Sequence, residues 1–210
     1  MKNIFISSTK ILVLFLLFQV PTGCMFIPGR LIPKVTKLPD KTMYIKKPKV
    51  NIELDWHTFL KGKDKEPVEK IHARYVLYEK VKNVTEKSNL FESYAIDKCQ
   101  GKNVDYTIQL DMLHYADNSK IKLATMISGL SFLIIPVAVK NNYKLTAKLL
   151  DANGNEIKTY VYDDYLKIWY QLFLLPFGVA TIKAPNEVIE NMIKNLYNDI
   201  LNDNYLKYSN

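Results

Sequence analysis

The sequence has few of the residues from which catalytic and ligand-binding motifs are built. It contains two cysteines, three histidines and seven glycines in 210 residues. His57, His72 and His114 do not stand at metal-ligand spacing, and no Gly-x-Ser-x-Gly stretch is present. The glycines are scattered, so no glycine-rich phosphate-binding loop is formed. The sequence therefore predicts no catalytic residue, no metal site and no cofactor, and we expect a protein that is not an enzyme.

Arginine is also scarce, since only Arg30 and Arg74 are present although the formal net charge is +8. The guanidinium fork is the preferred group for bidentate contacts with bases and phosphates. We therefore expect no nucleic-acid partner. The excess of lysine is interpreted either as a general aid to solubility or as a basic face for an anionic membrane surface.

The first 24 residues, MKNIFISSTKILVLFLLFQVPTGC, have the order of an export signal. Lys2 and Lys10 precede an apolar run at residues 11–20, and small residues then lead to Cys24. The run is too short for an ordinary membrane-spanning helix. This order predicts a signal peptide at residues 1–23.

The end of this leader, Thr22-Gly23-Cys24, resembles the lipobox of bacterial lipoproteins, although Pro21 stands where that family prefers leucine. The resemblance implies that Cys24 becomes the first residue of the mature chain, with diacylglycerol on its sulfur and a fatty acid such as palmitate on its amine. It also implies a domain that faces the periplasm. No aspartate follows the cysteine, which favours the outer membrane.

The rest of the chain divides into a short linker and one domain. Prolines at 28, 33 and 39 disfavour helix and central strand, so residues 24–41 are interpreted as a proline-rich tether that begins with the lipidated cysteine. Residues 42–210 are interpreted as a single α/β domain. With Cys24 lipidated, Cys99 has no partner within the chain, and the domain must be held together by its core.

Hydrophobic periodicity within this domain predicts an α+β fold. We expect a small mixed or antiparallel sheet of about four to five strands, with two main helices. The patterned segments are strands at 49–56, 89–96 and 104–115, a helix that begins at Pro67, a hairpin at 142–165 with an Asp-Ala-Asn-Gly-Asn turn, and a last helix that begins at Pro185 and is capped by Asn186. This order is similar to small periplasmic lipoprotein domains related to the TolB amino-terminal fold. The similarity implies an envelope interaction module.

Two apolar segments flank the hairpin, one at residues 123–139 and one at 168–182. As helices they would reach ~25 and ~22 Å, short of a bilayer core of ~30 Å. They are interpreted in three ways: as core elements packed on the sheet, as a side-by-side pair of short helices or arms that dips into the bilayer, or as a surface for a partner protein. The residues predicted to contact membrane or partner are Leu133, Ile134, Pro136, Trp169, Leu174 and Pro176.

Together these patterns predict a lipid-anchored bacterial cell-envelope lipoprotein that acts as a non-enzymatic, membrane-associated interaction module. Its expected partners are membrane lipid, through acylated Cys24, and an envelope protein. The alternative is an accessory subunit of an envelope transport or assembly complex. A hydrolase is a third hypothesis, for which the sequence names no residues.

Overall fold

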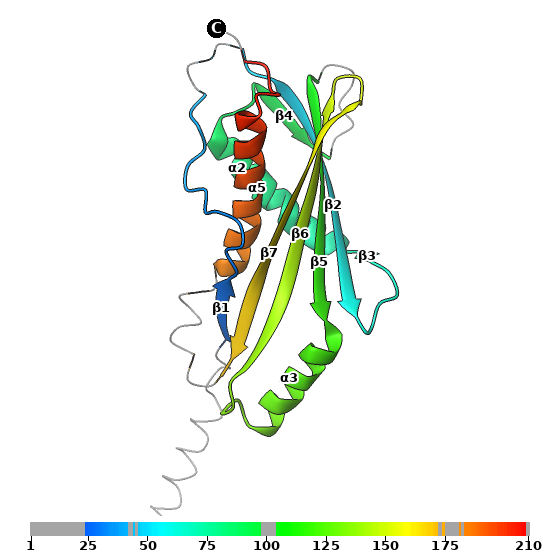
Figure 1. Ribbon diagram of the computed structural model, residues 1–210, viewed down its shortest axis with the longest axis vertical. Coiled ribbons are helices and arrows are strands. Elements are labelled where there is room, and N and C mark those ends of the chain that lie inside the picture. Colours follow the sequence, from blue (N-terminus) through cyan, green and yellow to red (C-terminus); the bar gives the residue numbers. More distant parts are fainter. Residues whose placement is uncertain are drawn as a thin grey trace, which may run out of the picture.

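A computed structural model describes residues 24–41, 44, 46–97, 104–171, 174, 181 and 183–208. The predicted signal peptide and Cys99 lie outside these residues. The described chain forms one curved sheet with helices packed against it (Figure 1). The elements are β1 (Cys24–Pro28), β2 (Lys49–Lys61), β3 (Val68–Glu69), α2 (Ile71–Ser88), β4 (Ser93–Ile96), β5 (Tyr106–Asp117), α3 (Asn118–Leu130), β6 (Val137–Asp151), β7 (Glu156–Tyr170) and α5 (Ala184–Asn202).

The sheet has the order β1-β7-β6-β5-β2-β3, and β4 also pairs with β2. Each of the first four strands in this order is antiparallel to its neighbours among them, whereas β2 is parallel to both β5 and β4. The predicted α+β class is confirmed. The described part of the chain has seven strands and three helices, more than the four to five strands and two main helices predicted. The prediction missed β1 among its prolines and two-residue β3. Helix α3 overlaps the first apolar segment, for which a short helix was one of the alternatives.

Strict alternation of apolar and polar residues gives the sheet one buried face. Val50, Ile52 and Leu54 of β2 are all buried, and Ile108 and Leu110 of β5 lie beside them in register. Apolar side chains of α2 and α5 cover this face. Burial of these side chains is the main favourable contribution to folding.

Helix α5 begins one turn earlier than its predicted cap. Its N-cap is Lys183, and Pro185 occupies the first turn, where its missing N–H needs no partner. Asn186 therefore lies inside the helix, and the prediction that it caps α5 was wrong. The apolar stripe of α5, at intervals of three and four residues, is buried at all four of its positions. They are Ile189, Met192, Leu196 and Ile200.

The predicted hairpin is formed by β6 and β7, and its turn has the expected chemistry. The carboxylate of Asp151 accepts hydrogen bonds from the amides of Asn153 and Asn155, both at 2.8 Å. Gly154 has φ +85°, a conformation that glycine adopts without the steric cost of a Cβ atom. The turn fixes the register that places the far ends of β6 and β7 side by side.

The proline-rich segment packs against the domain. Strand β1 pairs antiparallel with β7 along its whole length, and an edge strand tolerates Pro28 because one side of its backbone needs no ladder partner. The Gly29 amide then donates to the Tyr165 carbonyl at 2.7 Å, and the Leu31 amide donates to Asp164 Oδ1 at 3.2 Å. Asp164, only 3% exposed, therefore ties the N-terminal segment to β7.

Further along, two asparagines of α5 satisfy the backbone of this segment. The Val35 amide donates to Asn191 Oδ1 at 2.9 Å, and Asn195 Nδ2 donates to the Pro33 carbonyl at 2.9 Å. Ile32 packs against the hydrophobic core. The segment therefore crosses the domain with specific partners for its backbone.

Candidate functional site

Cys24 lies at one end of the sheet, where several strands begin or end. It pairs with Tyr170, the last residue of β7, which in turn pairs with Val137, the first residue of β6. Strand β5 ends at this same end of the sheet, and α3 follows it directly (Figure 1). Residues far apart in the sequence are thus gathered around the predicted lipidation site.

The Cys24 side chain is half-buried beside that of Tyr170. Burial raises the pKa of the Cys24 thiol above its usual value, and burial together with the neighbouring thiol raises the pKa of Tyr170. Two positions on, the Phe26 amide donates to Thr181 Oγ1 at 3.0 Å. The candidate lipidation site is therefore the first residue of a strand that pairs with β7 and also hydrogen-bonds to Thr181.

Helix α3 begins at this end of the sheet with a well-formed cap. Asp117 Oδ1 accepts hydrogen bonds from the amides of Ser119, at 3.0 Å, and Lys120, at 3.2 Å. This arrangement satisfies two amides that a helix start leaves without partners. Helix α3 runs from the end of β5 toward the start of β6 (Figure 1).

The orientation of α3 is the reverse of that of an ordinary amphipathic helix. The small residues Ala124 and Ser128 are its buried positions, whereas Leu123, Met126 and Leu130 are exposed. These three side chains recur at intervals of three and four residues and share one helix face. These three large apolar side chains therefore point away from the protein, whereas Ala124 and Ser128 point toward it, with half-buried Ile121 beside them.

The turn after α3 presents more apolar side chains in the same region. Phe132 and Leu133 have positive φ values of 49° and 62°, which are unfavourable for bulky residues and are found where the surroundings impose them. We name six exposed residues the apolar tip. They are Leu123, Met126, Leu130, Phe132, Ile134 and Ile135, with exposures of 53, 55, 77, 73, 60 and 53%.

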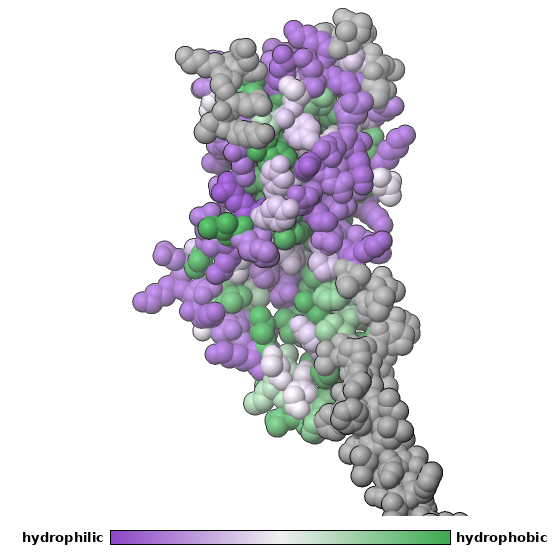
Figure 2. All heavy atoms as spheres, turned by 180° about the vertical axis from the view of Figure 1, so that it is seen from behind, coloured by the Kyte–Doolittle hydropathy of each residue, from purple (hydrophilic) through white to green (hydrophobic). Residues whose placement is uncertain are grey.

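Hydrophobic colour in Figure 2 gathers at the end of the molecule that carries α3, whereas the other end is largely hydrophilic. A contiguous exposed apolar surface marks a contact site more reliably than scattered exposed residues do. Within the described ranges, no helix is both long and apolar enough to cross a membrane.

The predicted contact residues fall partly within the tip. Ile134 and Pro136 are exposed and Leu133 is half-buried. Pro176 lies outside the described residues. Sequence reasoning did not single out Leu123, Met126 and Leu130, although their helical spacing was a usable signal.

The second apolar segment contributes Trp169 and Leu174, both half-buried. Lys167 Nζ lies 4.6 Å from the centre of the Trp169 ring, a favourable cation–π distance. The two apolar segments do meet, since residues 137–139 of β6 pair with 168–170 of β7. They contact each other as strands at this point.

A cavity of about 260 Å³ separates α3 from the sheet. Ile121 and Ala124 line it from the helix, Val139 and Asn141 from β6, and Tyr170 from β7. Tyr170 therefore contacts this cavity and also pairs with Cys24. The cavity therefore lies between the buried face of α3 and the cross-strand partner of Cys24.

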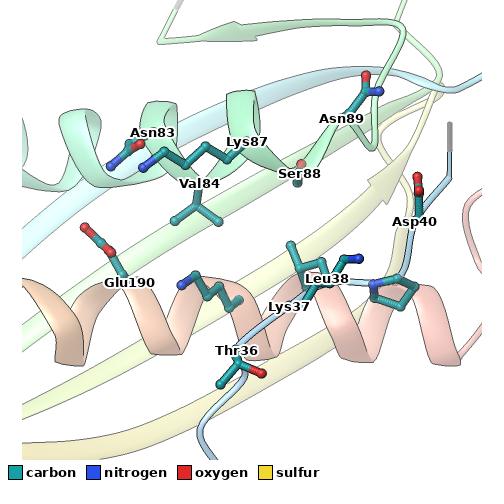
Figure 3. A pocket seen from close by; sticks show the side chains of 12 residues that line it. Thr36, Lys37, Leu38, Asp40, Asn83, Val84, Lys87, Ser88, Asn89 and Glu190 are labelled. Carbon is teal, nitrogen blue, oxygen red and sulfur yellow. The ribbon is translucent and has the colours of Figure 1, made fainter.

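A larger cavity, about 400 Å³, lies where residues 36–40 pass α2 and α5 (Figure 3). Lys37 comes from the N-terminal segment, Lys87 from α2 and Glu190 from α5. This cavity is formed where the N-terminal segment packs on the two helices. Its mixed charges point to no single ligand class.

The open, polar face of the sheet contains a histidine–carboxylate pair that sequence reasoning missed. His57 Nδ1 lies 2.8 Å from Asp111 Oδ1, and Asp55 is the register partner of Asp111. Both members of the pair are solvent-accessible, so the contact is a weak surface interaction. Across the part of the chain that the structure describes, no three His, Cys, Asp or Glu residues gather as a metal site.

No protein-family model matches the sequence, and no curated protein matches it. Among solved structures, the chain is similar to a minor lipoprotein from Acinetobacter baumannii, with 13% identity and a TM-score of 0.38 over 78% of this chain and 96% of that one. It is also similar to PelC from Paraburkholderia phytofirmans, with 8% identity and a TM-score of 0.34 over 83% and 98%. Similarities at this level define no family, and function is therefore inferred from the residues of this chain.

Proposed function

We propose that the protein is a bacterial cell-envelope lipoprotein whose folded domain is held at a membrane by lipid on Cys24. The observation that carries this proposal is the position of Cys24. It directly follows an export leader and a Thr-Gly step, and it is also the first residue of β1 at one end of the sheet. A cysteine at that place joins the lipid to the fold without a spacer.

The lipid anchor and the pairing of β1 with β7 together give the domain a defined orientation at the membrane. One acyl chain holds a protein only marginally at a bilayer, and two or more hold it stably. Strand β1 pairs with β7 from its first residue, so the distance between Cys24 and the domain is fixed. The end of the sheet that carries Cys24 therefore faces the membrane, and the opposite end extends into the periplasm.

We further propose that the domain is a non-enzymatic interaction module. Its polar sheet face, with Glu53, Asp55 and Asp111, is available for an envelope partner. This face supports the second candidate function, an accessory subunit of an envelope transport or assembly complex. The absence of an aspartate after Cys24 supports attachment to the outer membrane.

Acyl labelling of cells that produce the full chain tests the proposal. Wild-type protein should incorporate a fatty-acid label and fractionate with membranes, whereas Cys24→Ala should remain an unlabelled precursor. Cys99→Ala, the matched control, should be labelled like the wild type. Normal labelling of Cys24→Ala would exclude this cysteine as the anchor.

A further inference from the structure

We propose that the apolar tip inserts into the headgroup and acyl-chain boundary of the bilayer that holds Cys24, so that the domain has a second, non-covalent membrane contact. This inference rests on the proposed function, because the lipid on Cys24 is what brings the tip to the surface. The surface that the tip contacts is a lipid bilayer that contains anionic headgroups. Together with the covalent anchor, this second contact fixes the orientation of the domain at the membrane.

The reversed orientation of α3 is the first support. A helix that served only the core would place Leu123, Met126 and Leu130 on the sheet and its small residues in water. Here Ala124 and Ser128 are buried instead, and the three large side chains are exposed. An interfacial helix has this arrangement, because its apolar face is buried in lipid.

The second support is proximity to the anchor. Tyr170 is the cross-strand partner of Cys24, and it lines the same cavity as Ala124 and Ser128 of α3. The helix and the lipidation site therefore share one end of the sheet (Figure 1). Acyl chains on Cys24 would enter the bilayer where the apolar tip meets it.

The third support is the hydrogen bonding of the turn. A lipid environment offers no partner for a backbone amide, so amides that enter it must be satisfied internally. Every amide from residue 131 to 135 donates within the turn, and residue 136 is a proline without an N–H. The acceptors are Ile127 O for Ser131, Gly129 O for Phe132, Ser128 O for Leu133, Ser131 O for Ile134 and Ser131 Oγ for Ile135, at 2.8–3.4 Å.

Charge complementarity is the fourth support. Residues 118–150 contain no aspartate or glutamate, and they include Lys120, Lys122 and Lys140, all exposed. Lysines at the edge of an apolar surface extend toward headgroups while their aliphatic stems stay in the apolar layer. Each basic residue near an anionic leaflet adds to membrane attraction. The tip therefore combines an apolar centre with a cationic rim.

Photo-crosslinking of the full-length lipidated protein tests this contact. The protein is reconstituted in vesicles of phosphatidylethanolamine and phosphatidylglycerol that carry a diazirine in the acyl chain. Trypsin cuts after Lys122 and Lys140, so the tip is recovered in one peptide, 123–140. We expect lipid adducts in this peptide. An adduct yield no higher than in the peptide 71–74, which carries the 79% exposed Ile71, would overturn the inference.

A matched pair of variants separates insertion from mere exposure. Leu130→Glu with Phe132→Glu should lower the adduct yield of the tip at least fivefold, whereas Ile71→Glu should leave it unchanged. All three positions are exposed, and thermal melts of each variant verify that the fold persists. A wild-type adduct yield in the double variant Leu130→Glu with Phe132→Glu would also overturn the inference.

The mass of the peptide that carries Cys24, measured in the same sample, distinguishes a failure of tip insertion from a failure of the lipid anchor. Acylated Cys24 without tip adducts would overturn insertion and leave the anchor intact. Unmodified Cys24 would overturn the proposed function and, with it, the inference.

Discussion

Gly29 offers a direct test of how Cys24 is held at the end of the sheet. A Cβ atom at Gly29 would lie 2.6 Å from Tyr165 Cε1 and 2.7 Å from Asp164 Oδ1, well inside ordinary contact distance. Gly29→Ala therefore requires the Tyr165 ring or the strand to move. The shift would weaken the hydrogen bonds that the Gly29 and Leu31 amides make to β7.

Overpacking of this kind costs about 1–3 kcal/mol. Each 1.4 kcal/mol of lost local stability corresponds to about a tenfold change in the opening equilibrium. We therefore expect the β1 amides in Gly29→Ala to exchange with deuterium about ten- to a hundredfold faster than in the wild type. The amides of β5, at the centre of the sheet, should change much less.

Gly129 provides the control, because no heavy atom lies within 4 Å of the position that its Cβ would take. It lies inside α3, where alanine is more favourable than glycine by about 0.5–1 kcal/mol. Gly129→Ala should therefore leave β1 exchange unchanged. Unaltered exchange of β1 in Gly29→Ala would refute the close packing of this segment on β7.

Three further predictions concern the domain that supports the site. Tyr162 donates to Asp199 Oδ2 at 2.6 Å, so Tyr162→Phe should lower the free energy of unfolding by about 1–3 kcal/mol in urea titrations, and no loss would contradict the bond. Gly154→Ala should cost about 1–2 kcal/mol in the same assay, because φ of +85° is unfavourable for alanine, and a neutral result would contradict that turn geometry. Burial lowers the pKa of His114, so the folded state binds this proton more weakly than the unfolded chain. Stability should therefore fall as the pH drops below about 6.5, and His114→Gln should reduce that fall in melting temperature, whereas an unchanged pH profile would exclude His114 as its source.

The sequence was sufficient to predict those elements whose hydrophobic period is unambiguous. Val50, Ile52 and Leu54 alternate with polar residues, so the strand and its buried face could be predicted together. Helix α3 was one of several alternatives, because residues 123–130 are uncharged and have no polar face from which helix and strand can be told apart. Strand β1 was hidden by prolines, which an edge strand accepts.

The candidate site was predictable only in part. The leader predicted Cys24 as the lipidation site, but nothing in the sequence indicated that it pairs with Tyr170, 146 positions away. The His57–Asp111 pair depends on the parallel register of β2 and β5, which is set by long-range packing. Contacts between distant segments therefore required the structure.

The most direct test of the account is the intact mass of the mature protein extracted from membranes with mild detergent. We predict a chain that begins at Cys24 and carries the mass of a diacylglycerol thioether and an amide-linked fatty acid. A soluble chain with an unmodified, titratable Cys24 thiol would contradict the account.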